Sequence, residues 1–230
     1  MKITFILPAI GKKPGEKYIG TWKMEPLTIA VLKALTPKEI ETEFFDDRIE
    51  LIDYNTNTDL VCITVETYTA KRSYAIAKRF RERGIPIVMG GYHVTLCPEE
   101  AAEHCHSIII GNAETIWCQV LDDFKNRCLK KVYNGGVGSY DVLPDKGIFD
   151  GKKYLPVSLI ETGRGCCHSC EFCAISKYYC SHYYARNHEL IVQDIKNSKH
   201  KYAFLVDDNL VANKENAMRL FEKITPLNLK

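Results

Sequence analysis

Residues 60–91 read LVCITVETYTAKRSYAIAKRFRERGIPIVMGG and contain a complete strand, helix and second strand. Residues 60–65 are apolar and β-branched, as strands prefer. Residues 70–83 repeat apolar side chains at helical spacing and end at Gly84, a residue typical of helix termini. Residues 85–89 are apolar again. Strands that are apolar throughout are buried on both faces, and strands joined through a helix run parallel. The stretch therefore predicts an α/β fold with a doubly wound, Rossmann-like parallel sheet.

The same alternation continues on both sides of this stretch. Further strands are expected at residues 2–9 and 107–110, an edge strand at 41–45, and helices at 26–35, 98–104 and 114–127. Sheets of this type bind ligands at the carboxyl ends of their strands, here residues 8–11, 66–68, 90–95 and 111–114. A nicotinamide site is not favoured, because no GxGxxG follows the first strand. A receiver-like domain has the same topology, and fold alone does not decide function.

Gly90 and Gly91 end the strand at residues 85–89. Glycine has no side chain to block a bulky ligand from the backbone, so the pair is a candidate binding element. A tight turn from strand to loop explains the same two residues.

The second half of the chain has a different character. Residues 135–153 contain five glycines and little periodicity, so we place a linker there, between a domain at 1–134 and a second domain at 154–230. The second domain begins with an apolar strand at 157–161, and later has helices at 190–197 and 214–224 around a strand that begins at Tyr202.

Residues 163–173, GRGCCHSCEFC, contain a CxxxCxxC run formed by Cys166, Cys170 and Cys173. Three thiolates fill three corners of a four-iron four-sulfur cube and leave one iron open for a ligand, whereas electron-carrying clusters usually take four. Zinc is the alternative, with Cys180 or His182 as a fourth ligand. Structural zinc sites, however, generally use paired knuckles from separate turns, and this chain has no CxxC outside this one loop. The adjacent Cys167 and also Cys180 are interpreted as bystanders.

The cysteine run resembles that of radical S-adenosylmethionine enzymes, in which the open iron chelates S-adenosylmethionine and cluster reduction cleaves it to a deoxyadenosyl radical. This resemblance implies a partial TIM-type barrel of which residues 154–230 hold the first two of about six strand-helix units, so the chain is expected to be truncated within the barrel. It also implies contacts to S-adenosylmethionine from Phe172, beside the cluster, and from Asp207 and Asp208, at the end of the second strand. For Phe172 a plain packing role is open, and for the two acids the capping of the following helix.

The first half resembles the cobalamin-binding domain that many of these enzymes carry. The resemblance rests on GGYHVTLCPEE at residues 90–100 and on IGNAE at 110–114. It implies cobalamin contacts from the strand-end residues Glu66, Thr67, Tyr68, Gly90, Gly91, His93, Val94, Thr95, Gly111, Asn112 and Glu114. Two departures stand out: residues 111–114 read GNAE where the family often has GEGE, and no histidine precedes His93, so the DxHxxG cobalt ligand is absent. Cobalamin is therefore expected without a histidine at its lower face, which the loop 11–24 with Trp22 would cover.

Composition excludes several classes of protein. With 31 basic and 29 acidic residues spread along 230, the chain offers no basic face for nucleic acid. The apolar run at residues 3–10 is too short to span a membrane, and ten cysteines without a secretory segment favour a reducing cytoplasm. Five isolated cysteines are expected in the core: Cys62, Cys97, Cys105, Cys118 and Cys128.

Together these features predict a cobalamin-dependent radical S-adenosylmethionine enzyme that transfers a methyl group to an unactivated carbon. A cyclase or rearrangement enzyme of the same architecture is one alternative, and a non-catalytic fragment that binds cobalamin or metal is another. The expected partners are a small-molecule substrate, whose identity the sequence does not give, and an electron donor such as flavodoxin or ferredoxin.

Overall fold

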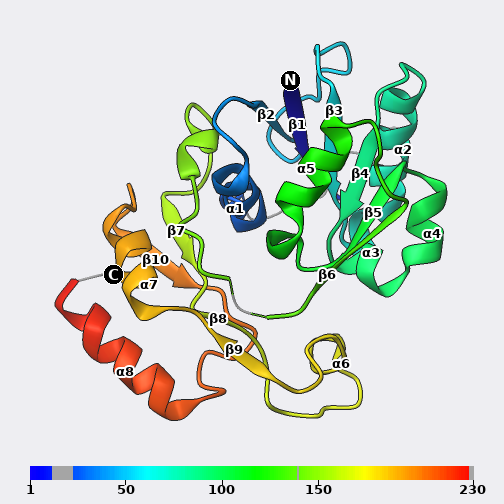
Figure 1. Ribbon diagram of the computed structural model, residues 1–230. Coiled ribbons are helices and arrows are strands. Elements are labelled where there is room, and N and C mark those ends of the chain that lie inside the picture. The colour runs from blue at the N-terminus through cyan, green and yellow to red at the C-terminus, as the bar shows by residue number, and fades with distance from the viewer. Residues whose placement is uncertain (12–22, 139, 228–230) are drawn as a thin grey trace. The chain divides into compact units, whose positions relative to one another are not determined.

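Six strands form one sheet in the order β2-β1-β3-β4-β5-β6 (Figure 1). They are β1 (Lys2–Leu7), β2 (Glu41–Asp46), β3 (Leu60–Thr64), β4 (Ile87–Gly90), β5 (Ser107–Gly111) and β6 (Val132–Gly136). Every neighbouring pair runs parallel. The computed structural model describes residues 1–11, 23–138 and 140–227, so most of the loop that contains Trp22 lies outside the described residues. The predicted parallel α/β sheet is confirmed, with β2 at its predicted edge.

The chain divides into two compact units. The first comprises Met1–Lys23, Leu35–Gly136 and Gly147–Lys153, and the second comprises Met24–Ala34, Val137–Lys146 and Tyr154–Lys230. Most of helix α1 (Leu27–Leu35) is grouped with the second unit. The stretch predicted as a linker contributes to both units.

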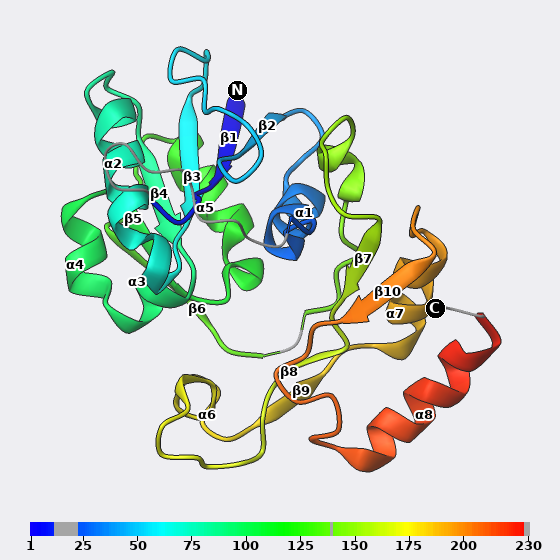
Figure 2. The same ribbon diagram turned by 180° about the vertical axis from the view of Figure 1, so that it is seen from behind.

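Both faces of the six-stranded sheet are covered. Helices α2 (Ala70–Arg81), α3 (Tyr92–Leu96) and α4 (Pro98–Glu103) lie on one face and α5 (Trp117–Lys125) on the other (Figures 1 and 2). Phe80 of α2 and Ile63 of β3 belong to one buried cluster. On the opposite face the Trp117 ring centroid lies 5.9 Å from that of Phe5, and the indole N–H donates to Thr36 Oγ1 at 2.9 Å. Burying side chains of this size contributes about 1.5–3 kcal/mol each, so these contacts fix the helices on the sheet.

Two elements of the first unit depart from the prediction. Strand β6 occupies residues expected to be loop and linker, and includes Gly135 and Gly136. A Cβ on Gly135 would lie 1.8 Å from Asn112 O, so close approach between neighbouring chain segments, which local sequence does not encode, demands glycine there. The short helix α3 replaces a predicted loop, and its backbone turns immediately after Gly91.

The second unit contains a parallel pair of strands, β7 (Val157–Ile160) and β10 (Tyr202–Leu205). Helices α7 (His188–Lys196) and α8 (Lys214–Ile224) pack against this pair through Ile160, Ile191, Ile195 and Leu220. An antiparallel pair that the sequence did not predict, β8 (Gly163–Gly165) and β9 (Tyr183–Ala185), flanks the cysteine run, and helix α6 (Ala174–Tyr178) follows it. Short 3-10 turns lie at Thr67–Thr69, Ala113–Thr115, Lys146–Phe149 and Thr225–Leu227.

The expectation of five core cysteines is wrong for three of them. Cys62 and Cys105 are buried, whereas Cys97, Cys118 and Cys128 are exposed. For Cys118, apolar neighbours in the sequence mislead because successive residues of a helix point in different directions. Trp117 and Val120 of α5 point into the core, and Cys118 points away from it.

Across the described ranges, no helix combines the length and the apolar character needed to cross a membrane.

Candidate functional site

The three cysteines of the CxxxCxxC run lie on one loop that leaves strand β8 and enters helix α6. Cys170 is exposed, while Cys166 and Cys173 are half-buried. The backbone N–H of Cys173 donates to Cys170 O at 3.1 Å, which folds the loop back on itself. Hydrogen bonds from the backbone and side chain of Ser176 lower the pKa of the Cys173 thiol. A lower pKa favours the thiolate, the form that binds metals.

The spacing of the sulfur atoms separates a single metal ion from a larger cluster. Zinc holds thiolates at about 2.3 Å, so sulfurs that share one zinc ion are less than about 4.6 Å apart. In the described part of the chain, no set of three ligand atoms mutually within 4.8 Å includes any cysteine of this loop. The described residues of this loop therefore do not form a compact three-ligand site for a single zinc ion.

The glycines that precede the loop are required by the β8–β9 pair. Gly165 has φ +82°, and a Cβ there would lie 2.2 Å from His182 O. A Cβ on Gly163 would lie 2.3 Å from the Tyr183 hydroxyl oxygen and 2.5–2.7 Å from its ring. This tight pairing fixes where Cys166 emerges, one residue after Gly165.

Asp207 and Asp208 follow β10 and point toward the segment that leads to Cys166. Asp207 Oδ1 accepts a hydrogen bond from Thr162 N at 2.7 Å, and Asp207 Oδ2 accepts one from the Thr162 hydroxyl. Asp208 Oδ2 accepts from Gly165 N at 2.8 Å. Burial raises the pKa of Asp207 above its ordinary value. The alternative of helix capping is wrong, since the Asn213 side chain accepts from the backbone of α8.

Phe172 is 93% exposed, so its alternative role in packing the core is wrong. It directly precedes Cys173 in the chain, and its exposed ring is available to a ligand of the loop.

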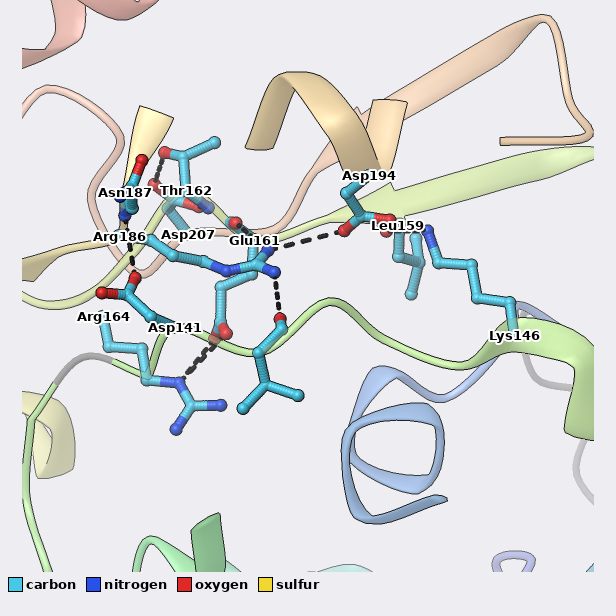
Figure 3. Close-up of polar contacts among 11 residues, drawn as sticks. Asp141, Lys146, Leu159, Glu161, Thr162, Arg164, Arg186, Asn187, Asp194 and Asp207 are labelled. Atoms are coloured by element: carbon cyan, nitrogen blue, oxygen red, sulfur yellow. Dashed lines mark hydrogen bonds and ion pairs between the residues drawn. The ribbon is translucent and has the colours of Figure 1, made fainter. Parts of the chain in front are cut away.

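A buried ionic network that the sequence did not predict links helix α7 to the segments that follow β7 and β9 (Figure 3). Asp194 of α7, 2% exposed, lies between two cations, with Lys146 Nζ at 2.7 Å from Oδ1 and Arg186 Nη1 at 3.5 Å from Oδ2. Arg186 also donates to Glu161 O at 3.2 Å and to Val142 O. Charged residues are almost never fully buried unless they are paired. Because Lys146 lies 48 residues before its partner Asp194, local sequence does not distinguish this buried pair from charges on the surface.

In the first unit, the predicted cobalamin residues gather at the carboxyl ends of β3, β4 and β5. Thr95 Oγ1 donates to Gly91 O at 3.1 Å and accepts from Gly111 N at 3.0 Å, which joins two of the loops. The Nδ1 of the buried His93 lies 3.3 Å from Thr67 Oγ1, which joins the third. Topology and geometry therefore bring these residues together at one rim.

The glycines of this rim serve the fold itself. Gly91 has φ +108°, and a Cβ there would lie 2.7 Å from Val65 O. Gly111 has φ +82°, and its Cβ would lie 2.4 Å from Gly136 O. A Cβ on Gly90 would make only ordinary contact with Ile109. The tight-turn interpretation thus explains Gly91 without a ligand.

The remaining predicted rim residues differ in exposure. Thr67 and Tyr68 are exposed, Val94 is fully buried, and Asn112 and Glu114 are half-buried.

His93 Nε2 lies 3.1 Å from Tyr74 Oη and 3.5 Å from Glu100 Oε1. With Cys97, His93 and Glu100 place their ligand atoms within 4.8 Å of one another. Both nitrogens of His93 already have polar partners, which accounts for this cluster without a metal.

Glu66 makes the stability of the first unit depend on pH. Burial raises the pKa of this carboxyl from 4.5 to about 6. Because the folded protein holds the proton more tightly, this contribution is complete below pH 4.5 and is lost as pH rises through about 6. The protonation of Glu66 is expected to change the free energy of unfolding by less than about 2 kcal/mol. Urea unfolding across this window should show stability falling in the wild type and a flatter profile in Glu66→Gln. An unchanged slope in that variant would assign the dependence to another group.

Comparison with known proteins shows that the chain is similar in sequence to methyltransferases. No family model matches the chain. It is 33% identical over 218 residues to bacteriochlorophyllide d C-8(2)-methyltransferase of Chlorobaculum tepidum, covering 82% of this chain and 47% of that protein. It is 27% identical to the C-12(1)-methyltransferase of the same organism, with 89% and 48% covered. The identity to hopanoid C-2 methylase of Rhodopseudomonas palustris is 24%, with 86% and 40% covered.

Among solved structures, the chain matches TsrM from Kitasatospora setae, a radical S-adenosylmethionine methyltransferase bound to its substrate tryptophan and to an analogue of S-adenosylmethionine. The TM-score is 0.72 at 15% identity, covering 98% of this chain and 51% of TsrM. The chain thus spans about half the length of the relatives it matches. It is homologous to methyltransferases, and it has the fold of the corresponding half of a radical S-adenosylmethionine methyltransferase.

Proposed function

We propose that this chain is the cobalamin- and cluster-binding part of a radical S-adenosylmethionine methyltransferase. One observation carries the proposal: three cysteines lie on a single loop that is anchored to the carboxyl ends of two parallel strands. The relatives support the reaction type, since they are methyltransferases of different substrates.

In this proposal the residues of the second unit have distinct tasks. Cys166, Cys170 and Cys173 hold a four-iron four-sulfur cluster with one iron open. Phe172 shields the cluster and faces the adenine of S-adenosylmethionine. Asp208 Oδ1 has no hydrogen bond among the described residues and would accept from the ammonium group of S-adenosylmethionine, a charge-assisted contact. Asp207 stays fixed beside it through Thr162.

The residues of the first unit are proposed to hold cobalamin at the rim. The exposed Thr67 and Tyr68 would contact the corrin edge, as would the backbone at Gly90, Gly91 and Thr95. The half-buried Gly111, Asn112 and Glu114 complete the set. Glu66 lies beside them, while His93 and Val94 support the rim from within. With no histidine among residues 1–92, the lower cobalt face would lack an imidazole.

When bound, these groups supply the reducing electron and the transferable methyl group, chemistry that no side chain provides. The chain binds and orients them. The substrate remains proposed as a small molecule with an unactivated carbon, and the electron donor as a flavodoxin or ferredoxin.

The full chain, purified and reconstituted without oxygen, tests the proposal. We expect bound iron, sulfide and cobalamin, and reductive formation of 5′-deoxyadenosine from S-adenosylmethionine. Methyl-labelled S-adenosylmethionine should pass its label to cobalamin. A bound cluster with deoxyadenosine but no label transfer would favour a rearrangement enzyme. Zinc in place of iron, or the three cysteines in disulfides, would overturn the proposal.

A further inference from the structure

Asn209 directly follows the two anchored acids, and its side chain reaches one of the three cysteines. Asn209 Nδ2 lies 3.3 Å from Cys166 Sγ, within hydrogen-bonding range of a sulfur acceptor. Both residues are half-buried. The contact joins the β10–α8 loop to the cysteine loop, 43 residues earlier in the chain.

A second hydrogen bond fixes which end of the Asn209 amide faces the sulfur. The backbone N–H of Val211 donates to Asn209 Oδ1 at 3.2 Å, so the amide oxygen is held away from Cys166. The orientation of a carboxamide is assigned from such partners. The amide therefore presents an N–H donor to the thiolate rather than an oxygen lone pair.

The acceptor is held as firmly as the donor. Gly165, the residue before Cys166, donates its N–H to Asp208 Oδ2 at 2.8 Å. Asp207 holds Thr162 in the same way, three residues upstream. Three consecutive residues thus hold this part of the chain. Asp207 bonds to Thr162 just after β7, Asp208 bonds to the backbone of Gly165, and Asn209 bonds to the Cys166 sulfur. Such a clamp aligns the Asn209 donor and the Cys166 sulfur before any cofactor binds.

We propose that Asn209 is a positioning residue that tunes the reduction potential of the cluster through an N–H···S hydrogen bond to Cys166. The inference rests on the proposed function, because it requires a cluster on this loop. Hydrogen bonds to cluster sulfurs are one of the factors that set the potential. The bond stabilises negative charge on the thiolate, and the reduced cluster carries more of it, so the bond raises the potential and eases reduction.

Two variants of the full chain separate tuning from simple support. Asn209→Leu removes the donor without adding charge. Asn209→Asp keeps the shape and the oxygen that accepts from Val211, but replaces the donor with a negative charge. We expect the Leu variant to disfavour cluster reduction about tenfold, a midpoint about 59 mV more negative for one electron, with a larger shift in the Asp variant. Cys167→Ala is the matched control, because that exposed thiol neighbours Cys166 and, within the described ranges, donates its hydrogen bond to Ala212 O at 3.4 Å, away from the Asn209 contact.

The midpoint is measured by redox titration followed with electron paramagnetic resonance, in the absence of S-adenosylmethionine. Exchangeable amide deuterons should couple to the reduced cluster in the wild type and in Cys167→Ala, and this coupling should weaken in Asn209→Leu. Equal midpoints in the wild type and both Asn209 variants, at equal iron content, would overturn the tuning role and leave the proposed function intact. Loss of the cluster in both variants, with unchanged circular dichroism, would make the role purely structural and overturn tuning. Failure of the wild type to bind a cluster would overturn both proposals.

Discussion

Cys170→Ala is expected to abolish cluster binding and, with it, every reaction that depends on cleavage of S-adenosylmethionine. Bound iron should fall from about four atoms per chain to background, because two remaining thiolates do not hold a four-iron cube. Cys170 is the cleanest of the three positions to change, since its side chain is exposed and fills no part of the core. Circular dichroism should therefore be unchanged while iron and sulfide are lost.

Two neighbouring thiols provide the control for this loss. Cys167 and Cys180 are also exposed, and both are interpreted as bystanders. Their alanine variants should retain iron, sulfide and deoxyadenosine formation. Full iron content in Cys170→Ala would contradict the assignment of the three cluster cysteines. Equal loss in Cys180→Ala would instead point to a four-cysteine site.

The second large effect is expected from Asp194→Ala, which should lower the free energy of unfolding of the second unit by about 3–5 kcal/mol. The substitution leaves Lys146 and the buried Arg186 without the carboxylate between them, and removing one partner of a buried ion pair costs this much. Because Arg186 also donates to Glu161 O, the strand that leads to the cysteine loop should loosen as well. The change is measured by urea unfolding of the full chain, followed by circular dichroism.

Glu189→Ala is the matched control on the same helix. Glu189 pairs with Lys223, but the two side chains are 74% and 44% exposed, and ion pairs as exposed as this one contribute little to stability. If Asp194→Ala costs no more than Glu189→Ala, the buried network does not stabilise the second unit as argued here.

Local sequence predicts the strands and helices whose apolar side chains follow a regular pattern. β1, β3 and β5 are mostly apolar because both faces of the sheet are covered, and their predicted positions agree with the structure within two residues. α8 was predicted at its observed bounds because its apolar side chains repeat at helical spacing. The elements that were missed depend on distant partners. Strands β8 and β9 are three residues each and exist only because Gly163 and Gly165 allow Tyr183 and His182 to approach.

The candidate site shows the same division. Cysteine spacing lies within one loop and is readable as a motif, so Cys166, Cys170 and Cys173 could be selected directly. The contacts of Asp207 and Asp208 could not, since their partners Thr162 and Gly165 lie 45 and 43 residues away. Asn209 carries no motif signal at all. Its contact with Cys166 depends on the position of the loop that follows β10, which only the structure shows.

The burial of Trp117 against Phe5 gives the chain a built-in optical label. The sequence contains two tryptophans, Trp22 and Trp117; Trp117 is buried in the first unit, and the residues of the second unit include no tryptophan. The emission of Trp117 consequently follows the melting of the first unit. A denaturation curve recorded by emission and one recorded by a backbone probe will coincide if the two units melt together, and will separate if they do not.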